Sequence, residues 1–279
     1  MQPEGICDQS CAAMNPSSSV PDFSEQWTKY ARQSGHYASE EMLADYLRPL
    51  LELSALRGLD VCEVGCGNGR FLPHFAKYAR TVTGIEPSDA FRNSEQHARD
   101  LGNVRIVHAD VYDVAIDEAF DCTFWLGVLH HTPDPVATVR QLRRMTRPGG
   151  LVVVWIYGRE GNGLYLLLAR LLRTITVRLP HRALEAASAL LAWPLKAYIR
   201  LCRILPLPMR SYMRRVLASY DDYALKLTIY DQLNPSIAGY WTRGELAGIL
   251  RAAGFDDAKF HHRHGYSWTA VAQRTESSA

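Results

Sequence analysis

No stretch of about 18 uncharged apolar residues occurs in the 279-residue chain, which excludes a membrane-spanning helix. The polar N-terminus also lacks the apolar core of a secretory signal, so the sequence predicts a cytoplasmic protein. The six cysteines include no Cys-x-x-Cys pair. Cys62, Cys66 and Cys122 fall in or beside expected buried strands, where reduced thiols pack as small apolar groups. Cys7 and Cys11 have no histidine nearby, and we expect no metal site.

The chain also has little net charge, but that charge is unevenly distributed. The formal net charge is +2, and 47% of the residues are hydrophobic, enough for one large core with a subdomain. Between Arg159 and Arg215 there are 11 basic residues and two glutamates, a balance of +9 that leaves −7 for the rest. A basic segment is therefore set apart from a weakly acidic remainder.

The most informative motif runs from Glu63 to Gly69. An apolar run ending at Val64 indicates a buried strand, glycines at 65, 67 and 69 make a tight turn, and the residues from Phe71 to Tyr78 return to helical spacing. Glycine lets a backbone approach a ligand closely, and the following helix start offers unpaired N–H groups. Arg70 occupies the third glycine position of the dinucleotide fingerprint, and no P-loop Lys-Ser/Thr pair follows. Both pyrophosphate-binding motifs are therefore excluded.

Further strands and helices alternate after this motif. Apolar patterns predict strands at 81–86, 104–110, 120–126 and 151–156, and later at 258–263 and 266–273. Two of these strands end on acids, Glu86 and Asp110. Asp134 and Pro135 are typical of a helix start, and Thr242 with Glu245 forms a capping box before the last helix. In an open α/β sheet ligands bind beyond the carboxyl ends of the strands, where the glycine motif and both acids are expected to lie.

Two of these motifs resemble those of a known family. The acidic-x-Gly-x-Gly-x-Gly stretch from Glu63 and the run Leu-His-His-Thr-Pro-Asp-Pro that ends at Pro135 are similar to motifs of the class I S-adenosylmethionine-dependent methyltransferases, in particular the small-molecule type of quinone biosynthesis. The resemblance covers roughly residues 40–157 and 235–273. It implies a doubly wound, mostly parallel seven-stranded sheet, the Rossmann-like methyltransferase fold. The Leu-, Ala- and Arg-rich residues between its two parts carry no strand pattern and predict a helical insertion after the fifth strand.

The resemblance also implies a cofactor and residues that bind it. S-adenosylmethionine would be held with Glu86 on the ribose hydroxyls and Asp110 on the adenine amino group, with Val111 beside it. The expected cofactor-binding residues are Glu63, Gly65, Cys66, Gly67, Gly69, Glu86, Pro87, Asp110, Val111 and Leu126. Tyr30 and Tyr37 would join them if the aromatic segment near the N-terminus closes over the cofactor. Alternatively, those aromatics only anchor that segment to the core.

The expected reaction is methyl transfer to an O, N or C nucleophile of a small or lipid-like molecule. A general base is needed only if the acceptor begins protonated, and His130 and His131, just past the fourth strand, are the candidates. Either histidine can instead merely shape the pocket. No Asn-Pro-Pro-Tyr follows the fourth strand, which argues against DNA-base and protein-glutamine acceptors. In 261–264 the strand pattern places His262 and His264 on one face, and we expect a polar cluster there rather than a metal site.

The expected organisation is a disordered leader at 1–21, an N-terminal and cofactor-binding part at 22–157, a basic helical segment at 158–234, and the end of the α/β domain at 235–279. We call residues 158–234 the insertion. Its leucine and arginine stripes predict three or four helices that form a lid over a hydrophobic acceptor and touch anionic lipid. A plain helical cap or dimer surface is the alternative, and the oligomeric state stays open.

Two other classes of function remain open. The basic balance can be the footprint of a nucleic-acid-binding protein. The regular apolar stripes favour a lid instead, so no nucleic acid partner is expected. The chain can also be a cofactor-binding regulator without activity.

Overall fold

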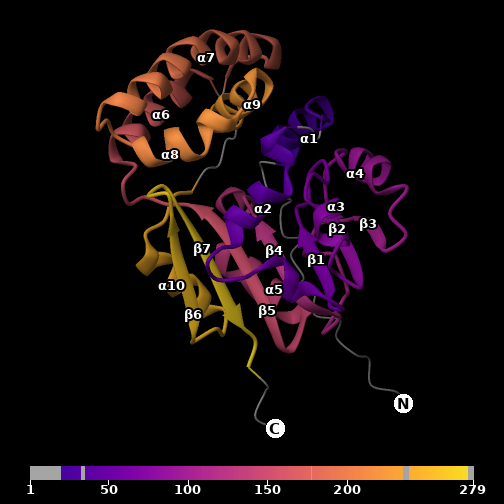
Figure 1. Cartoon of the computed structure of the whole chain (residues 1–279). Helices are drawn as coiled ribbons and strands as arrows, with labels where there is room; N and C mark the ends of the chain where they lie inside the picture. Colours follow the sequence, from indigo (N-terminus) through magenta and orange to yellow (C-terminus); the bar gives the residue numbers. More distant parts are fainter. Residues whose placement is uncertain (1–19, 33–34, 177, 235–238, 276–279) are drawn as a thin grey trace, which may run out of the picture.

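The computed structural model describes residues 20–32, 35–176, 178–234 and 239–275. Seven strands form one sheet in the order β3-β2-β1-β4-β5-β7-β6 (Figure 1). They are β1 (Asp60–Val64), β2 (Thr81–Glu86), β3 (Val104–His108), β4 (Phe120–Leu126), β5 (Thr146–Tyr157), β6 (Ala258–Arg263) and β7 (Ser267–Gln273). The first five strands are parallel, and β7 runs antiparallel to β5 and β6. The doubly wound, mostly parallel sheet expected from the sequence is confirmed.

Helices cover both faces of this sheet because alternate strand residues point to opposite sides. On β5, Val153 and Trp155 join the core cluster that contains residues of α2 and α3, while Val152 and Val154 join the cluster of α5 and α10. The helices of this part are α2 (Glu40–Leu47), α3 (Leu72–Ala76), α4 (Phe91–Ala98), α5 (Pro135–Met145) and α10 (Arg243–Ala252). The apolar runs of the central strands are therefore buried on two sides, as parallel strands usually are.

Local capping explains several helix boundaries. The Asp134 side chain accepts a hydrogen bond from the Ala137 N–H at 2.9 Å, and the Thr242–Glu245 capping box is formed. Both predicted starts are confirmed. α2 ends at Leu47 because Arg48 precedes Pro49 and a residue before proline avoids helical angles.

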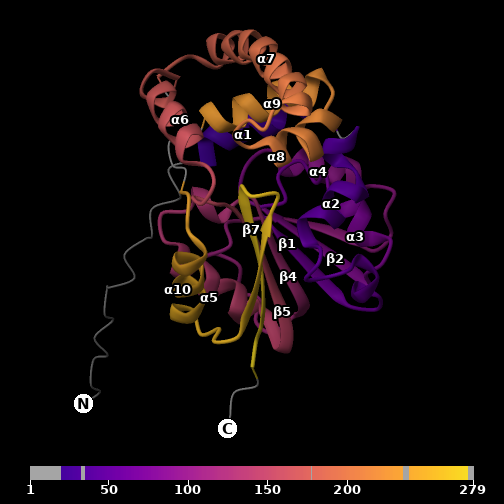
Figure 2. The same ribbon diagram turned by 60° about the vertical axis from the view of Figure 1, so that its left-hand side comes forward.

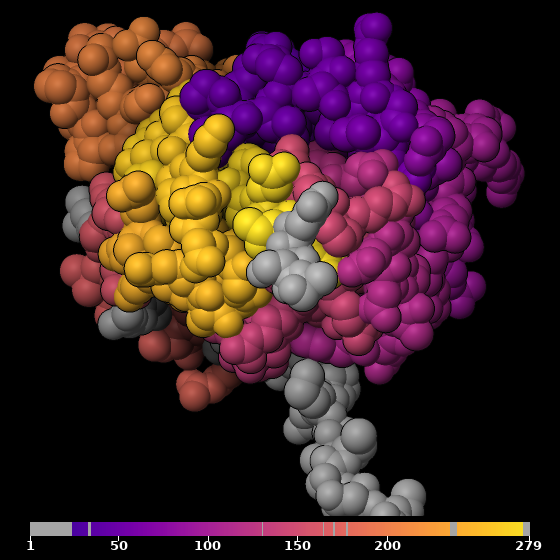
Figure 3. All heavy atoms as spheres, turned by 90° about the horizontal axis from the view of Figure 1, so that it is seen from below, coloured from indigo at the N-terminus to yellow at the C-terminus, as the bar shows by residue number. Residues whose placement is uncertain are grey.

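The insertion forms four α-helices at the carboxyl end of the sheet (Figure 2). These are α6 (Gly163–Thr176), α7 (His181–Ile204), α8 (Arg210–Arg215) and α9 (Asp222–Leu233). Both α6 and α7 pack against α9, and α1 (Val20–Lys29) lies beside it. Viewed from below, the insertion is visible only at the margin (Figure 3). The predicted leader lies outside the described residues up to position 19, together with Cys7 and Cys11.

Candidate cofactor and acceptor site

A pocket opens at the carboxyl ends of β1, β2, β4 and β5, beneath the insertion. The strand order reverses between β1 and β4, and such a switch point is where open α/β sheets bind ligands. The empty space amounts to about 1400 Å³, open mouth included. Predicted site residues that line it are Glu63, Gly65, Cys66, Gly67, Glu86, Pro87, Asp110, Val111, Leu126, Tyr37 and His131.

Two predicted site residues, Gly69 and Tyr30, are placed differently, and the position of a third is not tested. Gly69 does not line the pocket; a Cβ there would come within 3.0 Å of Ser94 Cα, so its positive φ and small size serve packing against α4. Tyr30 packs with insertion residues such as Leu184, and Trp27 is the α1 residue that reaches the pocket. The side chain of His130 lies outside the described residues.

The glycine loop is held by backbone hydrogen bonds to β2. The N–H groups of Gly65 and Cys66 both donate to the Ile85 carbonyl, at 2.7 and 3.2 Å. Gly65 has φ +67°, and a Cβ there would lie 2.8 Å from a Val128 methyl group. Only glycine therefore keeps this backbone in place beneath the ligand space.

Glu86 at the end of β2 has a buried carboxylate, 5% exposed, that faces this loop. It accepts hydrogen bonds from the Gly67 N–H at 2.8 Å and from the Ser88 N–H at 3.0 Å, and also from the Ser88 hydroxyl. Burial raises its pKa, and the bonds from Ser88 and Gly67 oppose that effect. The carboxylate is thus fixed at the pocket wall before any ligand arrives.

Glu63 and Arg70 leave polar atoms unpaired inside the pocket. One carboxylate oxygen of Glu63 and one terminal guanidinium nitrogen of Arg70 are buried without a hydrogen-bond partner among the described residues. Burial raises the pKa of Glu63 to about 8, while Arg70 acts in the opposite direction. The Arg70 guanidinium lies 4.1 Å from the Tyr37 ring centroid. A buried acceptor and a buried cation in one cavity match a zwitterionic amino-acid group, such as the methionine part of S-adenosylmethionine.

Asp110 and Val111 line the pocket beyond the end of β3. The Asp110 carboxylate accepts a hydrogen bond from the Tyr112 N–H at 3.1 Å, which orients it. The remaining carboxylate oxygen stays available to an amino group, so the residues present fit the expected adenine side of the cofactor.

The other half of the pocket is aromatic. Its rings come from α2, β5, the insertion and the β6–β7 turn: Tyr46, Trp155, Tyr157, Tyr212, Tyr220 and Tyr266. The rings of Tyr46 and Trp155 stack at 4.4 Å. Burial raises the pKa values of Tyr157, Tyr212 and Tyr220, so these hydroxyls stay neutral.

Asp231 on α9 is the acid that lines this aromatic half. It accepts hydrogen bonds from the Tyr157 hydroxyl at 3.1 Å and from the Gln26 side-chain amide at 2.8 Å. These two bonds connect the insertion to the sheet and to α1.

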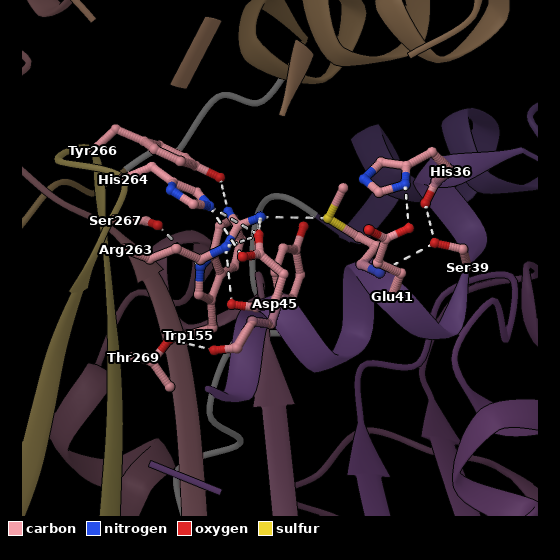
Figure 4. Close-up of polar contacts among 12 residues, drawn as sticks. His36, Ser39, Glu41, Asp45, Trp155, Arg263, His264, Tyr266, Ser267 and Thr269 are labelled. Atoms are coloured by element: carbon pink, nitrogen blue, oxygen red, sulfur yellow. Dashed lines mark hydrogen bonds and ion pairs between the residues drawn. The ribbon is translucent and has the colours of Figure 1, made fainter. Parts of the chain in front are cut away.

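An ion pair between buried Arg263 and half-buried Asp45 supports the aromatic wall (Figure 4). Arg263, whose side chain is 1% exposed, donates to the Asp45 carboxylate at 2.7 Å and to the Tyr266 hydroxyl. His264 Nε2 lies 3.0 Å from the same carboxylate. Its φ of +49° places His264 in the turn after β6, so the predicted strand face shared with His262 is wrong. Among the described residues no group of three His, Cys, Asp or Glu is arranged for a metal.

Sequence reasoning missed Arg70 and the aromatic half as site residues. Arg70 was interpreted only as a missing glycine, although a cation directly after a glycine loop is itself a signal. Tyr220 and Asp231 line the pocket, but tyrosine and aspartate in an insertion of this kind are equally typical of a solvated helix face, and no sequence pattern separates the two cases.

The central region of the chain is similar in sequence to known methyltransferases. Residues 62–154 match the methyltransferase domain family. A tRNA U34 carboxymethyltransferase from Pseudoalteromonas translucida is 34% identical over 119 residues, covering 41% of this chain and 37% of that protein. A ubiquinone biosynthesis O-methyltransferase from Paracidovorax citrulli is 31% identical over 121 residues, covering 42% and 51%. The chain therefore spans about half or less of the length of these relatives.

The fold likeness extends further than the sequence likeness. The crystal structure of a SAM-dependent methyltransferase from Aquifex aeolicus superimposes with a TM-score of 0.53 at 15% identity, covering 89% of this chain and 98% of that one. The expected Rossmann-like methyltransferase fold is confirmed.

Proposed function

We propose that the protein transfers a methyl group from S-adenosylmethionine to a small or lipid-like molecule. The premise is the class I S-adenosylmethionine-dependent methyltransferase domain that the chain contains at residues 62–154. The accepting atom is an oxygen, nitrogen or carbon nucleophile. The matched relatives have different acceptors in their names, so the acceptor class is argued from this chain's own pocket.

One observation carries the proposal: a single pocket has a polar half and an aromatic half. The polar half contains the glycine loop with Glu63, Glu86 and Asp110, and the aromatic half contains the rings of Tyr157 and Tyr220. A sulfonium-bearing nucleoside fits the first, and a flat or branched apolar molecule fits the second. Such pockets, mostly apolar with a few fixed polar groups, are typical of small-molecule sites.

The chain's own residues position and enclose the reactants. Bound S-adenosylmethionine would supply an electrophilic methyl group on a sulfonium. Glu86 and Asp110 would orient the nucleoside, Glu63 and Arg70 the amino-acid end, and the aromatic wall would exclude water and hold the acceptor nucleophile in line. Holding two reactants in line can supply roughly 7 to 11 kcal/mol of a barrier. The aromatic side chains of the pocket, packed against both reactants, help to hold them in line.

A proton must leave if the acceptor is a phenol, an alcohol or an ammonium. We propose that the imidazole of His131 accepts that proton, which its burial (5% exposed) and its position in the pocket lining support. Asp231 lines the aromatic half and is the other acceptor of protons there.

Cofactor binding is tested by calorimetry with S-adenosylhomocysteine. Glu86→Ala should weaken affinity at least tenfold, because a buried ribose loses its charged acceptor. The matched control is Glu95→Ala, which removes an exposed acid on α4 outside the pocket. Equal affinity of the folded Glu86 variant and the wild type would remove Glu86 from the site.

The acceptor class is tested by incubating cell extract with the protein and methyl-labelled cofactor. Label should enter the small-molecule or lipid fraction. The tRNA-related name among the relatives and the basic insertion favour one specific rival, a nucleic acid acceptor, and label in that fraction would overturn the proposed acceptor. Cofactor binding without label in any fraction would instead indicate an inactive regulator.

A further inference from the structure

Large exposed apolar side chains cluster on the insertion. Among the described residues, the large hydrophobic side chains that stand exposed all lie between Leu167 and Leu205. On α7 they follow one another at spacings of three, eight and three residues, which places them on one side of the helix: Leu190, 72% exposed; Trp193, 75%; Leu201, 47%; and Ile204, 80%. Contiguous apolar patches of this kind are rare on a protein surface unless something binds there.

The stripe on α7 runs the length of the helix. Ala183, Ala186 and Ala197 are also exposed and fall at the same helical spacing, so the stripe is apolar from one end to the other. At 1.5 Å per residue, the 24 residues of α7 span about 36 Å. The opposite side of the helix is buried, with Leu184, Ile199 and Cys202 packed against the rest of the insertion. The two sides of α7 are therefore both apolar, but the described residues cover only one of them.

A second helix has a similar face. On α6 the exposed side chains are Leu167, Leu168, Leu171, Leu172 and Ile175. Their spacing of one, three and four residues places them on one side of that helix. Both helices rest on α9 at the end of the molecule that carries the pocket (Figures 1 and 2). The exposed faces of α6 and α7 together are called the apolar cap below.

Basic side chains accompany the apolar cap. Arg182, Arg200 and Arg203 of α7 are exposed, and none has an ion-pair partner among the described residues. On a helical projection they fall on one flank of the apolar stripe. The Lys196 ammonium, on the same flank, lies 5.8 Å from the Trp193 ring centroid and is ion-paired with Asp222 at 2.6 Å, so the unpaired charge here is that of the three arginines. Unpaired positive charge beside exposed leucine, isoleucine and tryptophan is the composition of helices that lie in a membrane interface.

We propose that the apolar cap docks onto an anionic phospholipid bilayer. α6 and α7 lie in the interface with their leucines and Trp193 among the acyl chains and their arginines at the headgroups. No described helix is long and apolar enough to cross a bilayer, so the contact is peripheral. α9, which contributes Thr228 and Asp231 to the pocket, would then separate the pocket from the lipid by about one helix diameter.

Charge favours a lipid over a second copy of the chain. A two-fold dimer places the same patch on both sides of the interface, so it brings the unpaired arginines of both copies together without adding an acid to neutralise them. An anionic bilayer instead neutralises them. The positive balance of 11 basic residues against two glutamates between Arg159 and Arg215 points the same way.

The test is co-sedimentation of the full chain with vesicles, at low salt, without cofactor or acceptor. Vesicles of phosphatidylcholine and phosphatidylglycerol should bind the protein, and vesicles of phosphatidylcholine alone should bind it at least tenfold more weakly. The triple variant Leu190→Ser, Trp193→Ser, Ile204→Ser and the variant Arg200→Glu, Arg203→Glu should each lose at least tenfold. The control Arg57→Glu reverses the same charge at an exposed position before β1, at the other end of the sheet, and should bind normally.

Tryptophan fluorescence gives a second readout. Trp193 should shift to shorter wavelength when anionic vesicles are added, and the shift should disappear in Trp193→Phe although that variant still sediments with the vesicles. Absence of sedimentation with anionic vesicles, or equal binding by the triple variant, would overturn the proposal. A dimer that the triple variant dissociates, without vesicle binding, would show a second copy in place of lipid. None of these measurements involves methyl transfer, so their failure leaves the proposed function intact.

Discussion

The carboxyl groups near the two ends of β1 have opposite environments. At the start of the strand, the Asp60 carboxylate accepts hydrogen bonds from Arg80, Thr81 and Arg147, and these bonds, that from Arg80 foremost, hold its pKa well below the usual range. Near the end, Glu63 has a buried oxygen without a partner among the described residues, and burial raises its pKa to about 8.

This difference separates structure from function within one strand. A charged group whose hydrogen bonds are all made within the chain stabilises the fold, and a ligand could form no additional hydrogen bond with it. A charge left incomplete costs folding free energy and keeps binding capacity for a molecule that is not part of the chain. The carboxyl end of the sheet has two such groups, Glu63 and Arg70, in the same pocket.

The largest expected effect that tests this contrast is the pH dependence of stability at Glu63. Its folded-state pKa of about 8 lies above the unfolded value of 4.5, so between these values the folded chain binds a proton that the unfolded chain has lost. Stability should fall by about 1.4 kcal/mol per pH unit in that window. Glu63→Gln should lack the fall and be about 3 kcal/mol more stable near pH 7. Urea unfolding of both proteins from pH 5 to pH 8 measures it, and parallel curves would contradict the unpaired state of Glu63.

The next effect concerns Arg70. Arg70→Met keeps the side-chain volume against Tyr37 and removes the unpaired N–H, so cofactor affinity should drop by about 10- to 100-fold, the loss of one charged hydrogen bond. The free energy of unfolding should change by less than about 1 kcal/mol. Calorimetry and urea unfolding of the same samples measure both.

The matched control is Arg147→Met, which breaks the network at the opposite end of the sheet. It should leave cofactor affinity unchanged. A loss of affinity as large as that of Arg70→Met would mean that the two ends are not functionally separate.

The smallest effect is expected at Asp60. Its pKa is depressed, so its contribution is present above the unfolded value of 3.8 and is lost as pH falls below it. Asp60→Asn should cost about 1 kcal/mol near pH 7, since the arginine partners are partly solvated and weaken the ion pairs. Wild type and variant should converge in acid, the reverse of the Glu63 pair, and a cost that persists at low pH would show a packing defect instead.

Much of the sheet could be predicted because its strands have local signals. The bounds of β2 and β4 match the sequence prediction, since β2 ends on an acid followed by Pro87 and β4 ends on three large apolar residues followed by Gly127. β5 begins at Thr146, five residues before the predicted start. Pro148 and two glycines conceal that extension in the sequence, although the backbone there still pairs with β4 at Thr146.

Most of the site was predictable where residues end or directly follow strands, whereas Tyr37, in a short 3-10 helix, was expected only from the family resemblance. Glu86 and Asp110 end or follow their strands, so topology alone brings them to one rim. Tyr266 and Asp45 could not be placed in the same way, because the Arg263–Asp45 ion pair joins residues 218 positions apart and depends on how the β6–β7 turn meets α2. The number of insertion helices was expected. Their exposed apolar faces could not be distinguished from buried ones, because both have the same amino-acid composition.

Asp231 joins the insertion to two other parts of the structure. It receives hydrogen bonds from β5 through Tyr157 and from α1 through Gln26, while its own helix supports α6 and α7. A molecule at the outer surface that binds more tightly when α9 is in one of two positions also changes the affinity of the pocket for its ligand. By linkage, the pocket ligand changes the affinity at the outer surface by the same factor. A measured coupling between the two affinities would therefore report on a single helix rather than on the whole molecule.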